Sequence, residues 1–190
     1  MARPLSDEKR NALLAAAIDL FSERGIDATP TAAISKAAGV AEGSLFTYFE
    51  SKDGLVTALY LELKAELAQV LMRGFPRGGS VMKKLQQLWE LHVAWAAGAP
   101  KKMKVLELLL VSNRVDSESR RLAAEPFREV EETAQQAIED GTLRDIPMAF
   151  LNLIFSAMAS ATLQMIAADP AGARKHRRDG FEIFWSAIRR

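Results

Sequence analysis

Few side chains in this sequence could support covalent or metal chemistry. The 190 residues contain no cysteine and two histidines, His92 and His176, so the chain has no thiol nucleophile, no CxxC metal site and no HExxH zinc pair. Gly74 and Gly79 have the spacing of a phosphate-binding loop, but the next residue is Ser80 and not lysine. No dinucleotide-binding glycine pattern or nucleophile elbow is present. We therefore expect no catalytic residue, no metal and no cofactor, and predict that the chain is not an enzyme.

A cluster of small and polar residues between positions 42 and 48 satisfies what a helix needs in order to contact DNA bases. A helix that reads bases places small or polar side chains against base edges, in a groove about 12 Å wide. Gly43 has no Cβ and lets the backbone approach DNA, while Leu45 and Phe49 are spaced to anchor the helix to its own domain. The base-facing candidates are Glu42, Gly43, Ser44 and Thr47.

Composition predicts the scaffold that positions this cluster. Hydrophobic residues make up 49% and charged residues 26% of the chain, as in a folded globular protein of this length. The 31 Ala and 23 Leu far outnumber the 9 Val and 9 Ile, which favours helices over strands. We therefore expect an all-α protein. The first ten residues contain no apolar stretch of a secretion signal, and we expect a cytoplasmic location.

The N-terminal part predicts three helices. Ser6 can cap a first helix that runs to Gly25, and Thr29 is the expected N-cap of a second helix, with Pro30 as its first residue and Gly39 at its end. A third, brief helix covers 42–49. Two short helices joined by a tight glycine turn form a helix-turn-helix.

The remaining sequence predicts a larger helical domain. Ser51 is expected to cap a long amphipathic helix over 52–73. Pro126 should kink or divide the helical stretch that contains it, because proline lacks a backbone N–H and clashes with the preceding turn. We predict a helix-turn-helix domain over 1–51 and a ligand-binding and dimerisation domain over 52–190. The later helices are expected at 80–97, 101–114, 117–140, 147–168 and 173–189.

Residues 12–55 contain a set of short segments at fixed spacings, namely Glu23-Arg24-Gly25, Thr29, Ile34, Lys36-Ala37-Ala38-Gly39-Val40, Gly43-Ser44-Leu45, Tyr48-Phe49 and Ser51-Lys52-Asp53-Gly54-Leu55. Together these segments resemble the N-terminal domain of the TetR family of one-component transcriptional regulators. The resemblance implies a two-fold dimer that binds a palindromic double-stranded DNA operator. It also implies phosphate contacts from Thr29 and Thr31 at the start of the second helix, and from Tyr48 and Lys52.

Three residues depart from the family pattern. Ala41 replaces a usual serine, which removes a side-chain cap worth about 1 kcal/mol. Phe46 replaces a usual tyrosine, which removes a phosphate-binding hydroxyl. Glu42 is repelled by phosphates, although a carboxylate can accept a hydrogen bond from cytosine N4.

The N-terminal segment is not basic, which is unusual for a DNA-binding module. Residues 1–55 carry six Lys or Arg against eight Asp or Glu, a net charge of −2. We expect the cations to face DNA and the acids to lie on the other side. The cations concerned are Arg3, Lys9, Arg10, Lys36 and Lys52.

An apolar stripe in the last helix has two interpretations. Phe181, Phe184, Trp185 and Ile188 follow the spacing i, i+3, i+4, i+7. The family resemblance implies that the last two helices form a four-helix bundle with a second copy, in which Ala157 and Ala161 allow close approach. The alternative is that the stripe belongs to the core of its own chain.

Aromatic and apolar residues of the middle helices are candidates for a ligand cavity. Cavities are mostly apolar with a few placed polar groups, which predicts a hydrophobic or aromatic small-molecule effector. The alternative is again ordinary core packing. The candidates are Trp89, His92, Trp95, Met103, Leu106, Leu109, Asn113, Phe127, Phe155, Met158 and Thr162.

The uncharged run 146–168 is long enough to cross a membrane. Polar residues recur every four positions in it, at Asn152, Ser156, Ser160 and Gln164, and we expect a helix buried between protein surfaces and no membrane contact. Together these features predict a transcriptional repressor that a small effector releases from its operator. The alternative is a helical small-molecule carrier or enzyme with a vestigial helix-turn-helix.

Overall fold

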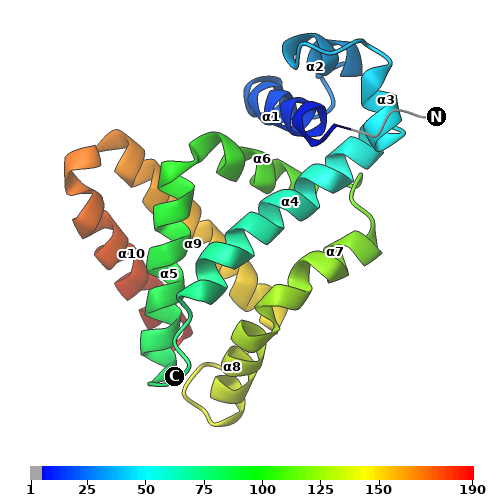
Figure 1. Ribbon diagram of the computed structural model, residues 1–190. Coiled ribbons are helices and arrows are strands. Elements are labelled where there is room, and N and C mark those ends of the chain that lie inside the picture. Colours follow the sequence, from blue (N-terminus) through cyan, green and yellow to red (C-terminus); the bar gives the residue numbers. More distant parts are fainter. Residues whose placement is uncertain (1–5) are drawn as a thin grey trace. The chain divides into compact units, whose positions relative to one another are not determined.

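The computed structural model describes residues 6–190, and this part of the chain folds into helices without a β-strand (Figure 1). The all-α prediction is therefore confirmed. The long helices are α1 (Asp7–Arg24), α4 (Lys52–Arg73), α5 (Val81–Gly98), α6 (Pro100–Val111), α9 (Met148–Ala168) and α10 (Ala173–Ile188). The shorter ones are α2 (Thr31–Ala37), α3 (Ser44–Phe49), α7 (Ser117–Ala124) and α8 (Arg128–Glu139), with single 3-10 turns at Glu125–Phe127 and Pro170–Gly172. Pro126 lies in the first of these turns and divides the predicted 117–140 stretch, as expected.

The helices form two compact units. Unit 1 contains the chain up to Ala65 together with Ala99–Ala123, and unit 2 contains Glu66–Gly98 and Ala124–Arg190. Helices α6 and α7 thus belong to the same compact unit as the N-terminal helices. The predicted domain boundary between residues 51 and 52 lies inside unit 1. That DNA binding belongs to residues 1–51, and ligand binding and dimerisation to residues 52–190, stays a prediction.

The core of unit 1 is made by regularly spaced apolar residues. Leu13, Ala17 and Phe21 recur every four residues along α1, which places them on one side of that helix, and all three are fully buried. Ser51 caps α4 as predicted, since its Oγ accepts a hydrogen bond of 2.9 Å from the backbone N–H of Gly54. Helices α2 and α6 both pack on α1.

Helix ends in unit 1 differ from the predicted ones. The third helix begins at Ser44 and not at position 42, because Ala41 has no side-chain acceptor to cap it and the next two residues form a turn. The second helix begins at Thr31, with Pro30 at the cap position. Ser6 precedes α1, but its side chain makes no capping hydrogen bond.

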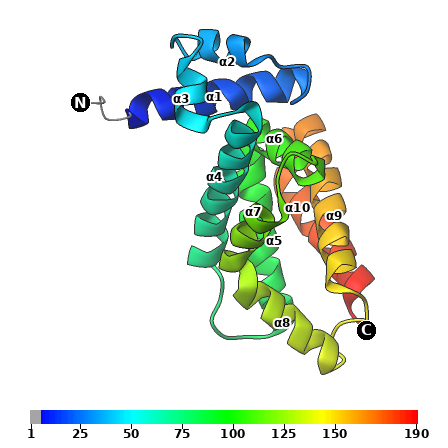
Figure 2. The ribbon, with the colours of Figure 1, turned by 90° about the vertical axis from the view of Figure 1, so that its right-hand side faces the viewer.

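Unit 2 is built around α9 and α10, which lie side by side with α5 against both (Figures 1 and 2). Its centre is an aromatic cluster in which the rings of Trp89 and Phe184 stack with centroids 5.6 Å apart. Phe155 meets both rings edge-on, at 5.5 and 5.4 Å. A Cβ at Gly180 would collide with the hydroxyl of Thr162, so glycine is what lets α10 approach α9.

Helix α9 is long and apolar enough to cross a membrane by length and composition alone. Only 17% of its most apolar window is buried in the single chain, so the described residues alone do not bury this helix, and its expected burial between protein surfaces stays a prediction. The helix packs on α5 and α10 with one side and leaves the other exposed, including the side chains of Phe150, Leu153 and Met165.

Candidate nucleic-acid interface

Helix α3 has one buried side and one exposed side. Leu45 and Phe49, one turn apart, are both buried and hold the helix against unit 1. Phe46 and Thr47 lie on the exposed side, and Phe46 is 47% exposed. Of the predicted base-facing residues, Glu42, Gly43 and Thr47 are exposed and Ser44 is half-buried.

Gly43, just before α3, is not required by the fold. Its φ of −70° suits any residue, and a Cβ added there would meet no atom within 4 Å. Gly54 is the opposite case, because its Cβ would run into the carbonyl oxygen of Phe49. The open space in front of Gly43 is consistent with the predicted close approach of another molecule.

The structure contradicts the phosphate contact predicted for Thr29. Thr29 is 0% exposed, and its hydroxyl donates a hydrogen bond of 2.7 Å to the carbonyl oxygen of Gly25. This bond closes the turn in which Gly25 adopts a φ of +82°. Thr29 therefore stabilises the turn between α1 and α2. Thr31, at the first position of α2, is half-buried, and Lys36 is exposed.

Tyr48 and Lys52 both have polar ends that can still bind a further group. The hydroxyl of Tyr48 accepts a hydrogen bond of 3.0 Å from the backbone N–H of Ser6 and keeps its own proton to donate. The ammonium of Lys52 has three donors, one of which binds the carbonyl oxygen of Asp27 at 3.3 Å. Partial burial, and then the nearby charge of Arg114, lower the pKa of Lys52.

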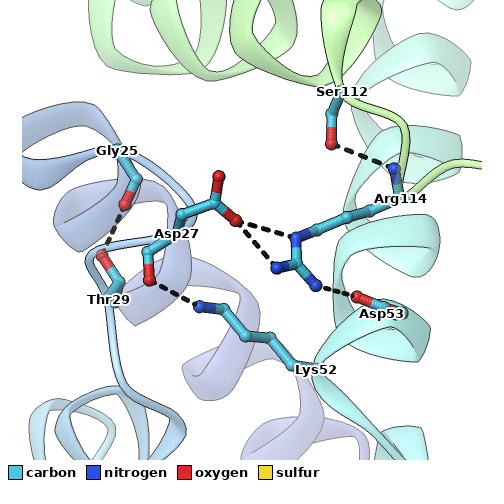
Figure 3. A network of polar contacts seen from close by, with 7 residues as sticks. All are labelled: Gly25, Asp27, Thr29, Lys52, Asp53, Ser112 and Arg114. Carbon is cyan, nitrogen blue, oxygen red and sulfur yellow. Dashed lines mark hydrogen bonds and ion pairs between the residues drawn. The ribbon is translucent and has the colours of Figure 1, made fainter.

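An ion-pair network that the sequence did not predict centres on Arg114 and includes Lys52 through Asp27 (Figure 3). Arg114, in the loop after α6, donates to Asp27 Oδ1 from Nε at 3.0 Å and from Nη2 at 2.8 Å. Its Nη1 donates to Asp53 in the first turn of α4 at 2.5 Å. These two carboxylates raise the pKa of Arg114. One guanidinium thus joins the loop after α1, the start of α4 and the loop after α6.

Cations from outside the N-terminal segment neutralise several of its acids. Lys101 at the start of α6 pairs with Asp19 at 2.6 Å, as Arg114 pairs with Asp27 and Asp53. Over its whole sequence, unit 1 carries thirteen Lys or Arg against twelve Asp or Glu. The net −2 of residues 1–55 is therefore offset within the same unit. Arg10 pairs with Glu62, and Arg3 lies outside the described residues.

The predicted ligand-pocket residues fall in both units. In unit 2, Trp89, His92 and Phe155 meet in the aromatic cluster, where the rings of His92 and Phe155 are 5.2 Å apart. Trp95 lies elsewhere on α5 and donates its indole N–H to Glu66. The hydroxyl of Thr162 donates to the carbonyl oxygen of Met158, and Phe127 is half-buried in its 3-10 turn.

In unit 1, Met103, Leu106 and Leu109 are buried on α6. Asn113 is exposed and lies in the loop beyond α6, which ends at Val111 and not at the predicted position 114. Within unit 2, two hollows of about 370 and 450 Å³ are lined mainly by polar residues of α8, among them Glu129, Glu132 and Gln136. Such linings do not suit a hydrophobic molecule.

The apolar stripe of α10 is mostly core of its own chain, and only part of it is accessible to a second copy. Phe181, Phe184 and Ile188 are buried in the core of unit 2 and do not face outward, in agreement with the alternative that the stripe is core. Trp185 is half-buried, and Ala157 and Ala161 of α9 are exposed. Of the residues predicted for the dimer interface, only Trp185, Ala157 and Ala161 are therefore accessible to a second copy.

Comparison with known proteins identifies this arrangement. The family model described as "Bacterial regulatory proteins, tetR family" matches residues 13–59, which run from α1 into α4. The crystal structure of a tetR family transcription regulator from Shewanella sp. PV-4 is similar over 96% of this chain and 98% of that chain, with a TM-score of 0.85 and 28% sequence identity. Residues 13–59 therefore match the TetR family model, and the chain as a whole is similar to a TetR family regulator in fold.

Two further comparisons concern regulators from Bacillus subtilis. The fatty acid metabolism regulator protein of Bacillus subtilis (strain 168) is 24% identical over 86 residues, and the match spans 45% of this chain and 44% of that protein. The structure of FadR from Bacillus subtilis in complex with stearoyl-CoA has a TM-score of 0.70 and 18% identity, over 94% of this chain and 98% of that chain. At that identity the likeness concerns the fold alone.

Proposed function

We propose that the chain is a homodimeric transcriptional repressor that binds a palindromic DNA operator through α3 and is released from it by a small effector. The observation that carries the proposal is the exposed side of α3, opposite its buried anchors, with open space in front of Gly43. Glu42, Ser44 and Thr47 would lie near base edges, and Thr31, Lys36, Tyr48 and Lys52 near phosphates. This assignment leaves no role for an active site, and the protein would act in the cytoplasm without membrane contact.

The proposed effector is hydrophobic or aromatic. Two points support this proposal: aromatic and apolar residues predominate among the residues that the sequence predicts to line a cavity, which the structure places in both units, and the stearoyl-CoA of the FadR complex includes a long apolar chain. The effector would act by binding the conformation with low affinity for DNA more tightly than the conformation that binds DNA. Release from the operator then follows from this difference in affinity.

The first experiment measures DNA binding by fluorescence anisotropy, with duplexes from the region flanking the gene at several salt concentrations. Lys52→Ala removes one phosphate contact per chain, so the log–log slope of affinity against salt should fall by about 2 for a dimer. Tyr48→Ala should also weaken binding. Arg121→Ala is the matched control, because it removes a positive charge from the same unit, at a residue paired locally with Glu118 on α7. Equal effects of Lys52→Ala and Arg121→Ala would contradict the proposed interface.

The pH dependence of binding tests Lys52 separately. Because burial lowers the pKa of Lys52, its ammonium loses the proton at a lower pH than a free lysine, whose pKa is 10.5. DNA affinity should therefore begin to fall on the alkaline side before that value is reached. Lys52→Arg should keep the affinity and remove the decline, since arginine stays charged throughout this range. An identical alkaline decline in both proteins would exclude Lys52 as its source.

A further inference from the structure

The ring of Phe46 is a large apolar group on the side of α3 that faces away from the core of unit 1. Single exposed hydrophobic residues are common on protein surfaces, so exposure alone has no meaning. The position of Phe46 matters because of the residues beside it on the exposed side of α3. Gly43 lies one turn before it and offers no side chain, and Thr47 follows it on the same exposed side.

The polar group of Thr47 is engaged within the helix. Its Oγ1 donates a hydrogen bond of 3.3 Å to the carbonyl oxygen of Gly43, a common arrangement for threonine in helices. This bond uses the only O–H donor of Thr47, so the hydroxyl can now only accept a hydrogen bond, and the methyl group is the apolar part of the side chain. The exposed surface formed by Gly43, Phe46 and Thr47 is thus mainly apolar, whereas a helix that reads bases by hydrogen bonds would present amide or guanidinium groups there.

The major groove of DNA contains one apolar group that such a surface can recognise. Thymine carries a C5 methyl group in this groove beside its O4 acceptor, whereas the other three bases present only hydrogen-bond donors and acceptors there. An aromatic ring or a threonine methyl gains by covering that methyl group. Cytosine at the same position would leave its N4 donor without an acceptor.

We infer that Phe46 is a specificity-determining residue, which contacts the C5 methyl of a thymine in each half of the operator. This inference rests on the proposed DNA binding through α3. Tyr48 and Lys52 set the position of the helix by binding phosphates, and Phe46 selects the base. The replacement of the family's usual tyrosine by Phe46 removes a hydroxyl and leaves the ring as the only recognition group at this position.

The test selects binding sites from a pool of random-sequence duplexes and then removes single methyl groups. The wild type should enrich a palindrome with a constant thymine in each half. Replacing that thymine by deoxyuridine removes the C5 methyl alone, and affinity should fall about fourfold for one half-site and about 15-fold for both. Phe46→Ala should bind the thymine and deoxyuridine duplexes equally. It should also keep the wild-type salt slope, because no phosphate contact is lost.

Two variants serve as controls. Phe46→Tyr keeps the ring and should retain the response to deoxyuridine. Leu122→Ala removes an apolar side chain with the same 47% exposure on α7 of the same unit, and should leave the response unchanged. If the pool yields no enriched sequence, the proposed DNA binding itself fails. If a palindrome is enriched but no deoxyuridine substitution lowers wild-type affinity, or Phe46→Ala keeps the response, the assignment of Phe46 is overturned.

Discussion

Two glycines near α3 illustrate how a single residue can serve either the fold or a partner. Gly54 lies in the first turn of α4, where any Cβ would strike the backbone of Phe49. Gly43 has an ordinary backbone conformation and open space around it. The fold therefore requires glycine at position 54 but not at position 43, where we propose that glycine allows the backbone to approach DNA.

Alanine substitutions should separate the two roles. Gly43→Ala should leave the protein folded or stabilise it by about 0.4–1 kcal/mol, because alanine restricts the unfolded chain. The same change should weaken operator binding about tenfold, since the added methyl group holds the backbone away from the bases. Gly54→Ala should instead lower the melting temperature. Thermal unfolding and anisotropy measure the two effects, and undiminished DNA binding by Gly43→Ala would refute its role.

Residue roles could be predicted from sequence where they depend on neighbours in the chain. Leu45 and Phe49 follow a helical spacing, and both are buried as expected. Thr29 was misassigned because its partner, the carbonyl oxygen of Gly25, becomes available only in the folded turn. Arg114 was missed because its partners Asp27 and Asp53 are more than sixty residues away in sequence, and no periodicity connects them.

At the scale of elements, the existence of helices was easier to predict than their ends. The run of apolar residues and the Ser51 cap predict α4 with its observed bounds. The starts of α2 and α3 shifted by one or two residues because their caps are Pro30 and Gly43, which offer no side-chain acceptor. The end of α6 shifted because the chain turns away after Val111, where Arg114 is held by acids of other elements.

The Arg114 network should stabilise the contact between the loop after α1, the start of α4 and the loop after α6 in unit 1. Arg114→Ala leaves Asp27 and Asp53 without their shared cation, so the loop after α1 should lose a tie to the start of α4. Because the pairs are exposed, the melting temperature should fall by only about 1–3 °C. Arg114→Ala should also lower operator affinity. Lys52 donates to the carbonyl oxygen of Asp27 in the loop after α1, so a looser loop should hold this proposed phosphate contact less firmly.

Arg114→Lys distinguishes charge from geometry in this network. Lysine keeps the positive charge but lacks the planar fork that engages both Asp27 and Asp53, so it should restore only part of the affinity. Arg121→Ala, whose partner Glu118 lies on the same helix, is the control for loss of an exposed cation. Full affinity in Arg114→Ala would show that the network has no part in DNA binding.

At the scale of the whole molecule, the exposed side of α9 is the surface best suited to a second copy of the chain. Exposed apolar residues recur every three or four positions along α9 and form one stripe on the side that faces away from the core of unit 2. The opposite side of α9 packs on that core, which contains Phe184. Large exposed apolar patches are rare on monomers. The exposed residues of the stripe are Phe150, Leu153, Ala157, Ala161, Met165 and Ala168.

A charge placed in this stripe should therefore separate the proposed dimer. Leu153, with 66% of its side chain exposed, can become glutamate without disturbing the core, whereas the same change at Phe184 would unfold unit 2. Leu153→Glu should sediment as a folded monomer and lose most of its operator affinity, because each half of a palindrome would then be bound independently. Val111→Glu, at an 81% exposed position in unit 1, should stay dimeric. If Leu153→Glu remains a dimer, the interface lies elsewhere. If the folded wild type is monomeric at all concentrations, the proposed two-fold recognition of a palindrome is wrong.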